Sequence, residues 1–135
     1  MGRAIYKPDP ALDEYLIFST ITDGTVSPVM NRKAIAQEWR DSCEAIYGER
    51  PSAEETEKSL ARADLNGQSW WRRRSYWDDE EHVSIRNMHP NPPFDDATCK
   101  HRDLAKLARA VACSDWAAAE ALLTNITRID EEEEP

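Results

Sequence analysis

The sequence predicts a single small α+β domain, and three features lead to that prediction. Two segments rich in β-branched and aromatic residues, 15–30 and 69–88, are each divided by a turn signal, which is typical of β-hairpins. About four further segments repeat apolar residues every three to four positions, as amphipathic helices do. A chain of 135 residues is long enough to bury one core, so we expect one domain over 1–129 and a solvated acidic tail over 130–135.

The first hairpin follows an extended lead-in over 1–13. Its first strand is predicted within 15–22, and Asp23-Gly24 between two β-rich runs is a strong signal for a tight turn. The second strand, within 25–30, contains Pro28, which cannot donate a ladder hydrogen bond. We therefore expect that strand at the edge of a sheet, or ending at the proline.

Two helices with clear start and stop signals follow the hairpin. The first is predicted over 32–47, between Asn31 as the N-cap and Gly48 as the C-terminal stop. The second is predicted over 53–65 and begins with a capping box headed by Ser52. Its apolar stripe is thin, so we expect this helix to lie on the surface.

The densest cluster of aromatic and charged residues lies at 69–82. Three of the five tryptophans fall within eight residues, three arginines stand between them, and four acids follow. The pattern predicts a strand over 69–77, a turn over 78–81 and a second strand over 82–88. Alternation along the first of these strands places aromatic residues and arginines on both faces.

A proline-rich loop over 89–94 leads into the last third of the chain. There, helix three is predicted to begin at Asp95 or Asp96 and helix four at Ser114, and together they would form a helical hairpin with an alanine-rich seam. The two predicted hairpins would join in one antiparallel sheet packed against the helices. The residues expected in the core are Leu16, Phe18, Ile35, Trp39, Ile46, Leu104, Leu107, Val111, Trp116, Leu122 and Ile126.

The net charge of −9 is concentrated in two short runs. Residues 130–134 contribute five negative charges and residues 78–81 contribute four, so the rest of the chain is balanced. A local acidic patch suits a basic partner and disfavours general affinity for the nucleic-acid backbone.

Composition also indicates the compartment. No apolar run is long enough to span a bilayer, and the first residues lack the apolar stretch of a secretory signal. The three cysteines, Cys43, Cys99 and Cys113, are odd in number and widely spaced, which is typical of free thiols in a reducing compartment. We therefore expect a cytoplasmic protein without a membrane partner.

The function that the sequence favours is non-enzymatic binding to another protein. Trp, Tyr and Arg are the residue types that dominate interfaces. On this hypothesis one face of the predicted strand supplies the contact residues, and the acids supply complementary charge that sets orientation and association rate. The alternative is that the aromatic residues build the core and the arginines pair with nearby acids. The predicted partner-binding residues are Trp70, Arg72, Arg74, Tyr76, Asp78, Asp79, Glu80 and Glu81.

Such a protein is expected to modulate or inhibit a partner whose surface is basic. Acidic runs can imitate the phosphates of nucleic acid and occupy a basic groove, as small phage-encoded inhibitors of host defence often do. The chain resembles those inhibitors in size and charge but shares no motif with them, so no family follows. The alternative reading of the runs is a solvated turn and a solubilising tail. A homodimer that buries the Trp-rich strand is also consistent with the sequence.

Two other functional classes remain open. A single-stranded nucleic-acid binder would use the Trp/Arg strand for base stacking and backbone contacts. A small enzyme would use Cys99 as nucleophile with His101 or His89 as base, or a cluster of Asp95, Asp96 and Asp103. Neither set is accompanied by a glycine-rich loop or an oxyanion element, so we predict no enzymatic activity.

Four residues of the types that bind zinc lie within twenty positions: His82, His89, Cys99 and His101. Their spacing fits no standard zinc pattern, and no Cys-x-x-Cys pair is present. We therefore predict neither a metal site nor a cofactor.

Overall fold

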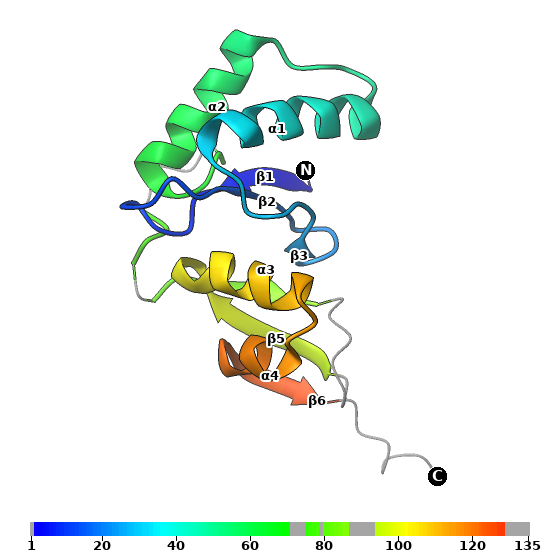
Figure 1. Ribbon diagram of the computed structural model, residues 1–135, viewed down its shortest axis with the longest axis vertical. Coiled ribbons are helices and arrows are strands. Elements are labelled where there is room, and N and C mark those ends of the chain that lie inside the picture. The colour runs from blue at the N-terminus through cyan, green and yellow to red at the C-terminus, as the bar shows by residue number, and fades with distance from the viewer. Residues whose placement is uncertain (1, 71–74, 79, 87–93, 129–135) are drawn as a thin grey trace.

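The computed structural model describes residues 2–70, 75–78, 80–86 and 94–128. Among these residues, two three-stranded antiparallel sheets alternate with helices, which confirms the α+β class (Figure 1). The strands are β1 (Arg3–Tyr6), β2 (Leu16–Ser19), β3 (Gly24–Thr25), β4 (His82–Ile85), β5 (Phe94–Lys100) and β6 (Leu123–Arg128). The helices are α1 (Arg32–Tyr47), α2 (Ala53–Asn66), α3 (Leu104–Ala112) and α4 (Trp116–Ala121), with a 3₁₀ turn at His101–Asp103 before α3.

The sheets and helices lie in layers along the long axis of the molecule (Figure 1). Helices α1 and α2 cover one face of the β1-β2-β3 sheet. Helix α3 lies between that sheet and the β4-β5-β6 sheet, and α4 packs beside α3. The chain therefore forms two apolar clusters, one on each side of the first sheet.

Strand β2 is buried on both faces, which explains its continuous apolar run. Tyr15, just before the strand, and Ile17 face the cluster beneath α1 and α2. Leu16 and Phe18 face the cluster around α3. Since successive side chains of a strand point to opposite faces, a strand covered on both sides needs apolar residues at every position.

The two helices of the first half begin and end where the sequence predicts. The side chain of Asn31 accepts a hydrogen bond from the backbone N–H of Ala34, and Gly48 ends α1 in the left-handed conformation. Ser52 likewise accepts from the N–H of Glu55 at the start of α2. Local capping hydrogen bonds are thus sufficient to fix these boundaries.

The prediction that Ile46 lies in the core is wrong, because its side chain is 51% exposed. Helix α1 has sixteen residues and is about 24 Å long. The four-residue strands beneath it span only about 13 Å. The last turn of the helix therefore extends beyond the sheet that would cover it.

A charged network joins α1, α2 and the end of β1. The hydroxyl of Tyr15 donates to Asp64, and the Arg32 Nε donates to the same carboxylate at 3.0 Å. Arg32 also donates to both carboxylate oxygens of Glu57, at 3.0 and 2.7 Å, and this contact lowers the pKa of Glu57. Lys7 lies 3.5 Å from Asp64. These contacts fix one end of the α1–α2 pair relative to the sheet.

Several predictions about strands are corrected by the structure. The lead-in contains β1, which pairs with β2. The described residues of the segment 69–77 do not form the predicted strand. Their backbone N–H groups bond to other segments: Ser69 N donates to Ile5 O, and Tyr76 N donates to Asn66 O. Strand β4 instead pairs with β5, so the two predicted hairpins do not share one sheet.

The last third also differs from the prediction. Asp95 and Asp96 belong to β5 rather than to a helix start, and α3 begins later. Asp115, not Ser114, caps α4 by accepting from the Ala118 N–H, while Ser114 adopts a positive φ of 56°. Helix α4 ends after six residues, and the chain returns as β6 beside β5. The predicted helical hairpin is therefore short and is followed by a strand.

The other predicted core residues lie in or against the clusters. The predicted core residues that are fully buried are Leu16, Phe18, Ile35, Leu104 and Leu107, and those packed against the core while partly exposed are Trp39, Val111, Trp116, Leu122 and Ile126.

Among the described residues, no helix combines the length and the apolarity that crossing a bilayer requires. All three cysteines carry free thiols, with Cys113 exposed.

Candidate functional site

Hydrogen bonds hold three residues of the acidic turn, which comprises residues 78–81. Glu81 N donates to Asp78 O at 2.9 Å, and Glu80 N donates to the Asp78 carboxylate at 3.0 Å. Beyond the turn, His101 N donates to Glu81 O at 3.0 Å. Asp79 lies outside the described residues. Asp78 and Glu80 are exposed and form no ion pair with another described residue, so both can present negative charge to a partner while one Asp78 oxygen accepts the Glu80 N–H.

The segment that enters the turn is held by Trp77. Its indole Nε1 donates to the carbonyl of Lys7 at 2.8 Å, which ties it to the end of β1. Its own carbonyl accepts from Arg102 Nη2 at 2.8 Å. The acidic turn is therefore attached to both the N-terminal strand and the 3₁₀ turn before α3.

The aromatic residues predicted to contact a partner are used mainly inside the molecule. Tyr76 is only 6% exposed, and its ring stacks 5.9 Å from that of His101. This corrects the expectation that Tyr76 is available at the surface. Trp70 is half-buried against the core around α3. Arg72 and Arg74 lie outside the described residues.

His101 and Cys99 also lie in the core. The His101 ring stacks between Tyr6 and Tyr76, with centroids 5.5 and 5.9 Å away. Its Nε2 lies 3.1 Å from the carbonyl of Gly67 and must carry the proton, because a carbonyl only accepts. Its Nδ1 is buried without a hydrogen-bond partner among the described residues. Burial lowers the pKa of His101 to about 4.

Burial likewise raises the pKa of the Cys99 thiol to about 12, so at neutral pH it is not the thiolate that nucleophilic catalysis requires. His82 is exposed, with Nδ1 2.9 Å from the carbonyl of Glu80, and His89 lies outside the described residues. In the described ranges, no group of three His, Cys, Asp or Glu side chains is arranged to hold a metal ion. The candidate zinc residues are thus not arranged as a metal site in the described part of the chain.

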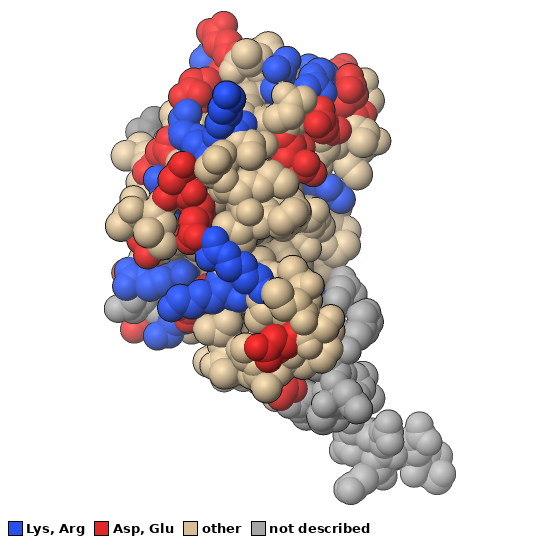
Figure 2. Space-filling view, viewed as in Figure 1, with Lys and Arg blue, Asp and Glu red and all other residues tan. Residues whose placement is uncertain are grey.

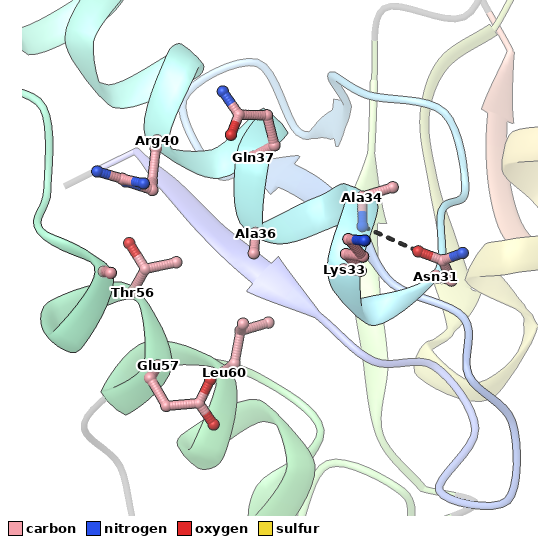
Figure 3. Close-up of a pocket in the computed structure, with 10 residues that line it drawn as sticks. Asn31, Lys33, Ala34, Ala36, Gln37, Arg40, Thr56, Glu57 and Leu60 are labelled. Atoms are coloured by element: carbon pink, nitrogen blue, oxygen red, sulfur yellow. Dashed lines mark hydrogen bonds between the residues drawn. The ribbon is translucent and has the colours of Figure 1, made fainter.

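A groove that sequence reasoning missed lies between α1 and α2 (Figure 3). Its volume is about 650 Å³, within the usual range of about 300–1,000 Å³ for ligand sites. Thr56 and Leu60 of α2 form its buried floor with the half-buried Ala36 of α1. Ala36 and Ala53 are the only sequence signal, since small residues on facing helices leave space between them.

The rim of the groove is cationic. Lys33 is exposed and forms no ion pair with another described residue. Arg40 lies on the same helix (Figure 3). Its Nε donates to the Pro51 carbonyl at 3.0 Å. Glu57 on the opposite wall is neutralised by Arg32. The groove therefore combines an apolar floor with net positive charge.

A second group of cations crosses the outer face of α3 (Figure 2). Arg102 just before the helix, Lys106 and Arg109 are exposed and spaced four and three residues apart, so they share one face. Arg109 pairs with Glu14, and Arg102 binds the Trp77 carbonyl. This band is therefore partly engaged in holding the fold, and it lies beside the acidic turn.

Comparison with models of known protein families, with curated proteins and with solved structures gives no match. The acidic turn, the α1–α2 groove and the α3 cations are the surfaces from which a function can be argued. The acidic turn is negatively charged, whereas the α3 cations are positively charged. Such charged surfaces favour binding through complementary charge.

Proposed function

We propose that the protein is a non-enzymatic binding protein that modulates or inhibits another protein through its acidic turn. The observation that carries this proposal is a turn whose backbone is fixed at both ends while the Asp78 and Glu80 carboxylates stay exposed. A fixed turn loses little conformational entropy on binding. Its charges would orient the partner and speed association.

The partner in this proposal presents a basic surface. The closely spaced carboxylates of Asp78 and Glu80 suit a groove that otherwise accepts nucleic-acid phosphates. A phage-type inhibitor of host defence acting in the cytoplasm is the kind of protein that works this way. Burial of Cys99 and His101 in the core is a further reason to favour binding over catalysis.

Reversing the two exposed charges of the turn should weaken partner binding without unfolding the protein. We expect Asp78→Lys/Glu80→Lys to reduce affinity at least about tenfold, because attraction to the basic partner becomes repulsion. The free energy of unfolding should change by less than about 1 kcal/mol, since both side chains are exposed. The partner is first captured from a nuclease-treated lysate, and its affinity is then measured by calorimetry.

The matched control is Glu49→Lys/Glu54→Lys, which makes the same change in net charge at exposed positions away from the turn. Equal losses of affinity in the two variants would show that net charge, not the turn, drives binding. A capture that is empty after nuclease treatment and full without it would identify nucleic acid as the ligand. In that case the cations at α3 are the site to test, because the described residues of the segment predicted as a Trp/Arg strand do not form a strand.

A further inference from the structure

We propose that the groove between α1 and α2 binds the acidic C-terminal segment, residues 129–135, of a second copy of the chain. This surface is separate from the acidic turn and goes beyond the function proposed above.

The groove is suited to a peptide that is both apolar and anionic. Its floor is formed by Leu60, Thr56 and Ala36, which offer no charge. The cations Lys33 and Arg40 stand on one wall, while the acid on the other wall, Glu57, is already paired with Arg32. An uncharged or basic peptide would bring no negative charge to Lys33 and Arg40, which form no ion pair with another described residue.

The C-terminal segment has that composition. It begins with one apolar residue, Ile129, and continues with five consecutive acids and a proline. The apolar side chain matches the floor, and the carboxylates that follow match the rim. Pairing this segment with the groove would bring together the largest run of negative charge in the chain and two cations, of which Lys33 has no other described partner.

The groove of the same copy is out of reach. Strand β6 ends at Arg128 at one end of the long axis, and α1 and α2 lie at the other end (Figure 1). Seven residues in extended form cover at most about 25 Å. A compact chain of 135 residues has a radius of gyration of about 14 Å, which corresponds to a diameter of at least about 35 Å. The segment must therefore enter the groove of another molecule.

The test uses the full chain with residues 130–134 replaced by glutamine, so that no acidic tail competes for the groove. A fluorescent peptide of residues 126–135 is titrated with this protein at low salt and followed by anisotropy. We expect saturable binding that is lost at high salt. Lys33→Glu in the same background should weaken it at least about fivefold, and Ala53→Trp should abolish it by filling the groove.

The matched control is Lys106→Glu, which makes the same charge change on α3 and should leave peptide binding unaltered. Sedimentation of the natural chain should show association that depends on concentration and disappears in the glutamine variant. Binding that is insensitive to both Lys33→Glu and Ala53→Trp would overturn the proposal, and so would equal affinity for a peptide of glutamates alone. Asp78→Lys/Glu80→Lys should leave peptide binding intact, so failure here is distinct from failure of the acidic turn to bind a partner.

Discussion

Replacing Gly67 with alanine is expected to lower the free energy of unfolding by about 3 kcal/mol, whereas Gly48→Ala should lower it by only about 1 kcal/mol. Both glycines end a helix with a positive φ, 97° at Gly67 and 78° at Gly48, so both substitutions carry the cost of a left-handed alanine. The difference between them comes from the surroundings.

A Cβ atom at position 48 would meet no other atom within 4 Å. At position 67 it would lie 3.1 Å from both His101 Cε1 and Trp77 Nε1, two rings that are themselves held by hydrogen bonds. Urea denaturation of the two variants measures the comparison directly. Equal losses at the two positions would show that these rings shift easily, which would contradict the tight packing inferred here.

Lowering the pH from 6.5 to 4 is expected to remove about 3 kcal/mol of stability through His101 alone. The folded-state pKa is about 4 and the ordinary value is 6.5. Between these two values the unfolded chain binds a proton that the folded chain does not, so stability falls as the pH falls through this window and is fully present above it.

The physical cause is the environment of the ring. Protonation would place a charge between Tyr6 and Tyr76 and a second N–H at Nδ1, where no described group accepts it. Unfolding free energies measured at pH 7, 5.5 and 4.5 should give a steeper pH dependence for the natural chain than for His101→Gln. His82→Gln, at an exposed position, is the control and should keep the steep dependence. The same slope in the His101→Gln variant would show that other groups are responsible.

The first half of the fold was predictable because its signals are local. Asn31 and Ser52 cap helices with their own side chains, and the glycines that follow each helix stop it within one residue. Such contacts depend on residues a few positions apart, which a sequence displays directly. The first strand was not predicted because its pairing partners, β2 and the segment around Gln68, lie outside its own local sequence.

The second half was less predictable because distant contacts decide it. Residues 94–100 carry two acids that are typical of a helix start, yet they pair with β4 and β6 on either side. Residues 123–128 continue the apolar period of α4, yet they complete the sheet. In both segments the hydrogen bonds offered by neighbouring strands outweigh local helical preference.

The candidate surfaces divide in the same way. Composition alone predicted the acidic turn, since four consecutive acids between two β-rich segments are typical of an exposed turn. The burial of Tyr76 depends on the path of the chain past His101, which no local pattern encodes. The groove depends on how α1 and α2 lie relative to each other, and the two helices are joined by contacts between distant residues, such as those of Arg32 with Glu57 and Asp64.

The sheet that is covered on both faces has a consequence for synthesis of the chain. When residue 69 leaves the ribosome, strands β1 to β3 and helices α1 and α2 are already outside it, and the N–H of Ser69 can bond to Ile5. The face that carries Leu16 and Phe18 is not covered until α3 has been made, about 40 residues later. At about 5–20 residues per second this interval lasts roughly 2–8 s. During this interval the nascent chain would expose the apolar face of the first sheet to solvent. Chaperones that bind exposed apolar surface would bind the chain most strongly at this stage.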